Sequence, residues 1–115
     1  MGDSDKFVLR WNDFEKNIVG AYKDLRSDKN FQDVTLACQG GTFSAHRVIL
    51  SACSNTFKSI LKETNAPHPV IVLWDIEARD VSALLDFMYN GQVRVVSLNY
   101  FLEELMAIIE NRSVE

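Results

Sequence analysis

Several features are scarce in this chain, and each absence argues against a class of protein. The 115 residues include two cysteines, two histidines and two prolines. Two cysteines inside apolar patterns do not make the disulfide framework of a small secreted domain, and they suit a reducing compartment. No apolar run reaches the roughly 18 residues of a membrane-spanning helix, and the start MGDSDK lacks the apolar core of a signal peptide. These absences predict an intracellular, soluble domain that does not bind a membrane.

Basic charge is also in short supply. The chain carries 12 Lys and Arg against 16 Asp and Glu, which gives a formal net charge of −4. A domain that binds phosphate backbones normally presents a basic face, whereas the basic residues here are scattered along the sequence. We therefore expect no direct binding of nucleic acid by this domain.

Motifs for catalysis or metal binding are missing as well. Cys38, Cys53, His46 and Asp33 lack the CxxC or HxxxH spacing that brings metal ligands together. His46 stands between a predicted strand and a predicted helix, and no Ser or Cys nucleophile motif accompanies it, which favours a structural histidine. Gly40-Gly41 is too short for a phosphate-binding loop and predicts a turn. The sequence thus predicts no enzyme, no metal and no cofactor.

What the chain does contain is organised around residues 33–61. Alternating apolar side chains predict a strand with one buried face, and they are Val34, Leu36 and Cys38. Gly40-Gly41 predicts the turn of a hairpin whose second strand covers Thr42 to Ala45. Two short helices follow from the spacing of the next apolar residues, with Ser54 as the N-cap of the second helix.

The N-terminal part combines a short apolar segment with an amphipathic helix. Phe7 to Trp11 predicts a strand, and an exposed apolar strand at a chain end is a pairing site. Asn12 and Glu15 have the spacing of a capping box at the start of the helix. The apolar stripe of this helix consists of Phe14, Ile18, Ala21, Tyr22 and Leu25. Amphipathicity alone predicts that the helix packs on the core of its own chain.

The C-terminal half alternates strands and helices. The continuous apolar run from Val70 to Trp74 predicts a strand covered on both faces. Helical spacing from Val81 to Tyr89 predicts a helix that ends at Gly91. A short strand over Gln92 to Val96 and a last helix capped by Ser97 complete the order. The elements predict an α+β fold in a single domain, since domains commonly have about 100–150 residues.

Several stretches carry a resemblance to a known family. FSAHRVILSACSNTFKSIL closely resembles the centre of a BTB (POZ) domain, and FVLRWNDFEKNIV resembles the N-terminal signature of the insect tramtrack/bric-à-brac subgroup. DVTLAC, HPVIVL and LLDFMYNGQV extend the resemblance, in order, over about Phe7 to Val96. The BTB domain is expected to span residues 7–110, with flexible ends at residues 1–6 and 111–115.

The resemblance implies a helical cluster flanked by a small sheet, with the N-terminal strand exchanged between the two chains of a dimer. The residues that it places in the dimer interface are Phe7, Val8, Leu9, Trp11, Phe14, Ile18, Tyr22, Val93 and Val95. Asp33 and Arg47 match the oppositely charged residues that line a pocket at the interface of BTB dimers. An intramolecular or surface ion pair is the other interpretation, and an exposed pair contributes about 0–1 kcal/mol.

The function implied by the resemblance is protein–protein interaction in a nuclear regulator of transcription or chromatin. The implied partners are a second copy in a homodimer or higher oligomer, other BTB proteins and co-regulators. A substrate adaptor is the alternative, because Leu61 and Glu63 fit the loose apolar-x-Glu pattern by which some BTB domains dock a cullin-type ubiquitin ligase. So loose a tripeptide also fits an ordinary helix end.

Overall fold

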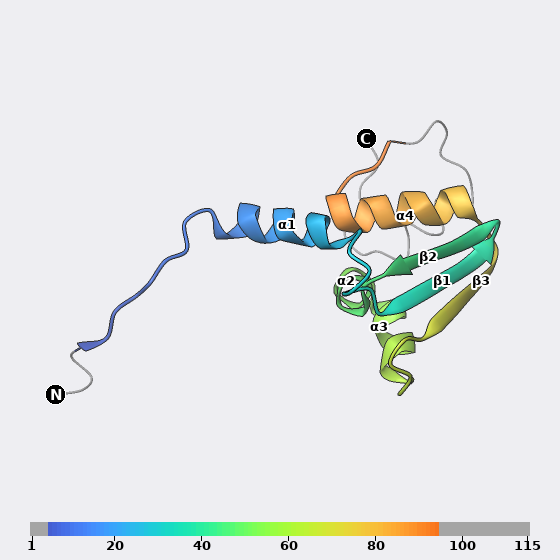
Figure 1. Ribbon diagram of the computed structural model, residues 1–115, viewed down its shortest axis with the longest axis horizontal. Helices are drawn as coiled ribbons and strands as arrows, with labels where there is room; N and C mark the ends of the chain where they lie inside the picture. Colours follow the sequence, from blue (N-terminus) through green and yellow to red (C-terminus); the bar gives the residue numbers. More distant parts are fainter. Residues whose placement is uncertain (1–4, 95–115) are drawn as a thin grey trace.

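The sheet is built around strand β1, Val34–Gln39, which has a neighbour on each side. In this computed structural model, which describes residues 5–94, β1 pairs antiparallel with β2, Gly41–Ala45, and parallel with β3, Val70–Glu77 (Figure 1). Val34 and Leu36 are fully buried on one face of β1, as their alternation predicted. The predicted hairpin is confirmed, and its second strand begins one residue earlier than expected.

The hairpin turns at a glycine whose backbone few other residues can adopt. The register pairs Cys38 with Gly41, so that Gln39 and Gly40 form the loop. Gly40 has a φ of 93°, in the left-handed region where a side chain is strained. Gly41 is already part of β2. The turn therefore depends on the first glycine of the pair.

Three helices share one core with the sheet. They are α2, Arg47–Cys53, α3, Asn55–Lys62, and α4, Ala78–Asn90. The predicted cap of α3 is confirmed, because Oγ of Ser54 accepts a hydrogen bond from the Phe57 N–H at 3.2 Å. The predicted end of α4 is confirmed at Gly91, which has a φ of 79°. The buried core consists of Val34, Leu36, Ala45, Leu50, Phe57, Leu61, Ile71, Val81, Leu84, Leu85 and Tyr89.

Strand β3 has one open face, so the prediction of a strand covered on both faces is wrong for the single chain. Ile71 points into the core, whereas Val70, Val72 and Trp74 are 59%, 48% and 77% exposed. A continuous apolar run indicates that both faces favour an apolar neighbour, but it does not say which chain supplies that neighbour. Here the chain's own helices share a core with one face.

Helix α1, Phe14–Leu25, projects from the rest of the molecule (Figure 1). None of its residues is buried, so the interpretation from amphipathicity alone, that the helix packs on the core of its own chain, is wrong. The position in a dimer interface that the resemblance implied stays a prediction. The predicted capping box is not formed either. The N-cap is Asp13, which has a left-handed φ of 57° and makes no side-chain hydrogen bond to the helix.

The stretch from Phe7 to Trp11 is extended, and the structure assigns it to no strand (Figure 1). Phe7, Val8 and Leu9 are 86%, 83% and 94% exposed, where a strand over Phe7 to Trp11 was predicted. A strand needs a second strand to complete its hydrogen bonds, and within residues 5–94 none pairs with this segment. The predicted strand at 92–96 is irregular as far as residue 94; its end and the last predicted helix lie outside the described residues.

Candidate interaction surface

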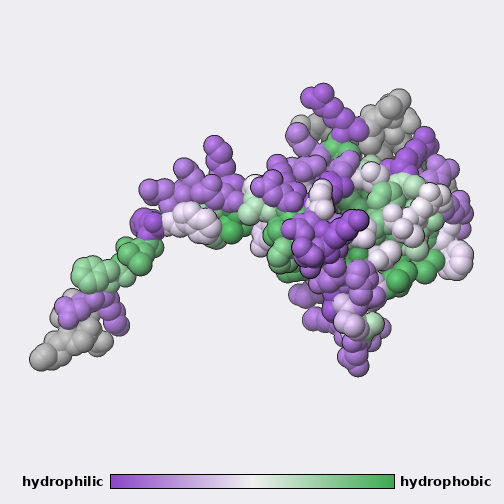
Figure 2. All heavy atoms as spheres, in the orientation of Figure 1, coloured by the Kyte–Doolittle hydropathy of each residue, from purple (hydrophilic) through white to green (hydrophobic). Residues whose placement is uncertain are grey.

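The apolar stripe of α1 is left uncovered by the part of the chain that the structure describes. Phe14 and Tyr22 are exposed and Ile18 is half-buried, and exposed Val19 lies beside the stripe and widens it. The ring of Trp11 packs edge-on against Phe14 with a centroid distance of 5.2 Å, which joins the extended segment to the stripe. Figure 2 shows hydrophobic atoms along both parts. The predicted interface residues before position 25 are thus all exposed or half-buried in the single chain, and the Trp11–Phe14 contact links the two parts.

Contacts near Arg26 hold the C-terminal end of α1 against the core. The Arg26 guanidinium lies 2.8 Å from Oδ1 of Asp86 on α4, and it stacks over the ring of Tyr89 at 4.9 Å. The Arg26 carbonyl also accepts a hydrogen bond from Gln32 at 2.8 Å. The helix is therefore fixed at its base while its apolar stripe remains open.

Asp33 and Arg47 are brought together, but through the backbone. Oδ1 of Asp33 accepts a hydrogen bond from the Arg47 N–H at 2.7 Å, and no ion pair joins the two side chains. His46 occupies the N-cap position of α2 without capping it, so Asp33 satisfies a free N–H of the first turn in its place. The contact fixes the start of β1 against α2.

Two hollows meet at Asp33. One, of about 200 Å³, lies between α1 and α2 and is lined by Tyr22, Leu25, Phe31, Asp33, His46, Val48 and Ile49. The other, of about 480 Å³, lies over α2 and α3 and is lined by Asp33, Arg47, Val48, Ser51, Lys58, Leu61 and Lys62. The larger hollow, which Asp33 and Arg47 both line, thus contains one carboxylate and three cationic side chains. That a dimer interface lies there stays a prediction.

His46 is held by the core in the structural role that the sequence suggested. Its backbone N–H donates to the Tyr89 hydroxyl at 3.1 Å, and the same hydroxyl lies 2.6 Å from Nδ1. The hydroxyl oxygen accepts from the backbone, and it either donates its own hydrogen to Nδ1 or accepts a second hydrogen bond there, according to the imidazole tautomer. Burial raises the pKa of Tyr89. The pair connects the hairpin to α4.

The described part of the chain offers little for metal or thiol chemistry. Within residues 5–94 no three His, Cys, Asp or Glu side chains come together as metal ligands would. Cys38 and Cys53 are half-buried free thiols, and burial raises the pKa of Cys53, which makes its reactive thiolate scarcer. None of the helices described is long and apolar enough to span a bilayer.

The remaining predicted site residues are dispersed. Leu61 lies in the core, 4% exposed, while Glu63 is exposed at the end of α3, so the apolar half of the suggested cullin contact is not available to a partner. Val93 packs near Ala83 of α4, and Val95 lies outside the described residues. The open face of β3 was not among the predicted sites, although the apolar run that forms it was visible in the sequence.

Comparisons with known proteins identify the family to which this fold belongs. The BTB/POZ domain family matches residues 22–110. The Broad-complex core protein isoforms 1/2/3/4/5 of Drosophila melanogaster are 49% identical over 90% of this chain, which spans 14% of that protein. Longitudinals lacking protein-like, from the same organism, is 47% identical over 83% of this chain, which spans 75% of that protein.

A solved structure gives the same result for the fold. The BTB domain of zebrafish PATZ1 superimposes with a TM-score of 0.68 and 26% identity, covering 89% of this chain and 82% of that one. Protein tramtrack and the bric-a-brac proteins of Drosophila melanogaster are further relatives, in agreement with the subgroup that the N-terminal signature indicated. The α+β fold, the family match and these relatives together show that the chain belongs to the BTB/POZ domain family.

Proposed function

We propose that this chain is an assembly domain that forms a homodimer through the Phe7–Trp11 segment and the apolar stripe of α1. The observation that carries the proposal is that α1 is amphipathic and yet buries none of its residues. An isolated helix of 12 residues is marginal in water, because helices shorter than about 12–15 residues rarely stabilise themselves. The helix therefore needs a packing partner that its own chain does not supply.

A second copy is the partner that fits. Each copy would exchange its Phe7–Trp11 segment onto the other and pair it with the chain around Gln92 to Val96. Burying a large apolar side chain that is otherwise exposed contributes about 1.5–3 kcal/mol, and the segment and stripe together present several of them. Such an interface belongs to the obligate, largely apolar class above about 2,000 Å².

Assembly of this kind suits a regulator of transcription or chromatin in the nucleus. BTB domains are protein-interaction modules, and this chain is one of them. A dimer joins whatever is attached to each copy, which raises avidity for clustered DNA sites without any base contact by the domain. Other BTB proteins and co-regulators would use the same surfaces. The BTB domain would cover residues 7–110, without catalytic activity of its own.

The oligomeric state in solution tests the proposal. Ile18→Glu places a charge in the centre of the α1 stripe, and Lys16→Glu makes a larger charge change on the opposite side of the same helix. Light scattering in the micromolar range should find a dimer or larger species for the wild-type and Lys16→Glu proteins. Ile18→Glu should shift the protein toward monomer. A folded wild-type monomer at these concentrations would remove the proposal.

A further inference from the structure

Strand β3 presents both an open edge and an open apolar face. Within residues 5–94 it stands at the end of the sheet order β2-β1-β3, so β1 is its one strand neighbour. The exposed residues Val70, Val72 and Trp74 alternate along it and share one face. Hydrophobic atoms are visible on the side of the molecule where β3 runs (Figure 2). An edge of this kind is a pairing site for another strand.

The backbone groups of the open edge can be identified from the ladder. The Thr35 N–H of β1 donates to the Pro69 carbonyl at 3.0 Å, so residue 69 faces β1. Backbone groups alternate in direction along a strand, and those of Val70 and Val72 therefore point away from β1. Pro69, which has no N–H, does not interrupt the open edge. The register with β1 slips after Leu73, which ends the regular part.

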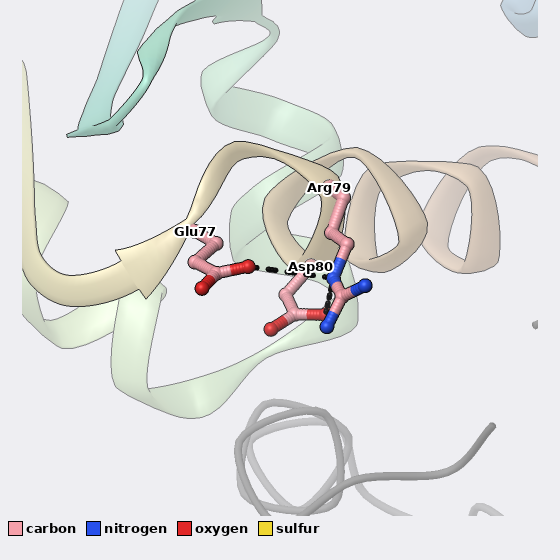
Figure 3. Close-up of polar contacts among 3 residues, drawn as sticks. All are labelled: Glu77, Arg79 and Asp80. Atoms are coloured by element: carbon pink, nitrogen blue, oxygen red, sulfur yellow. Dashed lines mark ion pairs between the residues drawn. The ribbon is translucent and has the colours of Figure 1, made fainter.

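The usual protection against edge pairing is absent from the N-terminal part of β3. Lys, Arg and Pro are the residues that commonly block an edge, and none occurs from Val70 to Trp74. Acidic residues follow at Asp75 and Glu77. Oε2 of Glu77 already lies 3.4 Å from Nε of Arg79 (Figure 3). The Glu77 carboxylate therefore already has a basic neighbour in its own chain and does not require one from a partner.

We propose that the β3 edge pairs antiparallel with the β3 edge of a second copy, centred on Val72. In this register Val72 lies opposite Val72 of the other copy, and the two residues exchange both N–H···O bonds because their groups face outward. Val70 lies opposite Trp74 of the other copy, where the side chains meet on the apolar face but the Trp74 carbonyl does not join the ladder, because Nε2 of Gln39 in its own chain donates to it at 2.9 Å. The pairing is thus self-complementary, as a two-fold interface requires.

Charge decides between the possible arrangements of the two strands. Antiparallel pairing about Val72 sets Asp75 opposite residue 69 and keeps the two Asp75 carboxylates about 20 Å apart, at about 3.3 Å per residue. Parallel pairing in register would instead set Asp75 against Asp75 and Glu77 against Glu77, and like charges directly opposite are destabilising. The sequence of β3 therefore selects the antiparallel arrangement with its own copy.

The β3 pairing rests on the proposed dimer, because species larger than a dimer form only when each unit carries two β3 edges. A contact of a few residues per strand falls below the roughly 1,000 Å² of a stable interface, so one β3 pair binds weakly. A dimer built through α1 carries two such edges, and linked contacts reinforce one another in a ring or chain of dimers. The two interfaces involve different residues and can be removed separately.

Sedimentation velocity on the complete chain tests the pairing with a matched pair of variants. Val72→Lys places a charge on the edge, and Thr42→Lys places the same charge on the same rung and face, on the opposite edge strand, because both residues pair with Ala37. The wild-type and Thr42→Lys proteins should form species larger than a dimer as concentration rises. Val72→Lys should lose these species and keep the dimer. Trp74→Lys, at the most exposed of the three positions, should do the same.

Other outcomes separate this inference from the proposed dimer. A wild-type protein that remains a dimer at every concentration would overturn the β3 pairing, leaving the edge to a strand of another protein, while the proposed dimer stands. Loss of the larger species in the control Thr42→Lys as well as in Val72→Lys would also overturn the β3 pairing. A Val72→Lys protein that is monomeric would support the β3 contact and overturn the α1 dimer. Circular dichroism of each variant confirms that it is folded.

Discussion

The Tyr89 hydroxyl oxygen lies 2.6 Å from Nδ1 of His46 and joins the end of the hairpin to α4. The same oxygen accepts the His46 backbone N–H at 3.1 Å. One buried hydroxyl therefore satisfies two polar groups at the start of α2. The Arg26 guanidinium stacks on the Tyr89 ring and holds the C-terminal end of α1 there.

Tyr89→Phe should destabilise the fold while leaving assembly surfaces intact. The substitution keeps the ring but leaves the His46 N–H and Nδ1 unpaired in the core. Each unsatisfied buried group costs about 1–3 kcal/mol, so we expect a loss of about 2–4 kcal/mol in the free energy of unfolding. Urea denaturation at matched protein concentration measures it. Tyr22→Phe, on an exposed ring, should change stability far less; equal effects would contradict the role of the Tyr89 hydroxyl.

The pH dependence of stability should carry the signature of Tyr89. Because burial raises its pKa, the folded protein keeps the phenolic proton under conditions where the unfolded chain releases it. The resulting stability is fully present below about pH 10, the ordinary pKa of tyrosine, and is lost as the pH rises through the raised value. The difference in unfolding free energy between wild type and Tyr89→Phe should therefore shrink above about pH 10. A constant difference from pH 8 to pH 11 would contradict this.

Asp33 should matter through its carboxylate, and Arg47 should matter little for the same contact. The carboxylate accepts the Arg47 backbone N–H at 2.7 Å, a bond that survives when the Arg47 side chain is removed. Loss of a capping side chain costs about 1 kcal/mol. Asp33→Ala should therefore lower the unfolding free energy by about that amount, and Arg47→Ala by less. A double variant that costs clearly less than the sum of the two would indicate a side-chain ion pair instead, because each single variant would already lose that pair.

The sequence predicted the elements whose signals are local. Gly40 requires its φ in the hairpin turn, Ser54 accepts a hydrogen bond at the start of α3, and Gly91 ends α4. Each of these depends on the residue and its immediate neighbours. The family resemblance, and no local signal, identified Asp33 and Arg47 as partners, and it did not show that the carboxylate bonds to the backbone.

The sequence could not predict what covers an apolar surface. The stripe of α1 and the apolar run of β3 were both visible as patterns. Amphipathicity alone assigned the stripe to the chain's own core, and only the family resemblance placed it in a dimer interface, while the run of β3 predicted cover on both faces. A pattern records that a surface favours burial, because transfer of apolar area from water is non-directional. It does not record which chain buries it. The candidate sites are therefore the two places where the predicted burial and the observed exposure disagree.

DNA binding by the isolated domain should be absent at physiological salt. Affinity for a phosphate backbone comes from Lys and Arg that release counterions, and the net charge of −4 opposes it. Arg47, Lys58 and Lys62 gather around one hollow, so any residual binding should occur there. Fluorescence anisotropy at about 0.15 M salt measures the affinity. Salt-dependent binding at low micromolar concentration would be the contrary result, and Lys58→Ala would then locate it.

Removal of residues 1–11 should weaken the dimer without unfolding the domain. The segment from Phe7 to Leu9 is almost fully exposed in the single chain, so its loss removes no contact from the core. The segment stabilises the dimer only in the exchanged position, where burial of each large apolar side chain contributes about 1.5–3 kcal/mol. The dimer dissociation constant should therefore rise by at least about tenfold, which corresponds to about 1.4 kcal/mol. The α1 stripe should hold the weaker dimer that remains.

A shorter truncation separates the effect of the apolar segment from that of shortening the chain. Removal of residues 1–5 leaves Phe7 to Trp11 in place and should leave the dissociation constant unchanged. Circular dichroism should show the same helix and strand content for both truncated proteins, because the hairpin and helices of residues 33–91 contain their own core. Sedimentation velocity at matched dilutions supplies the two dissociation constants. If removal of residues 1–11 left the dimer as tight as removal of residues 1–5, the extended segment would have no part in the interface, and α1 alone would carry it.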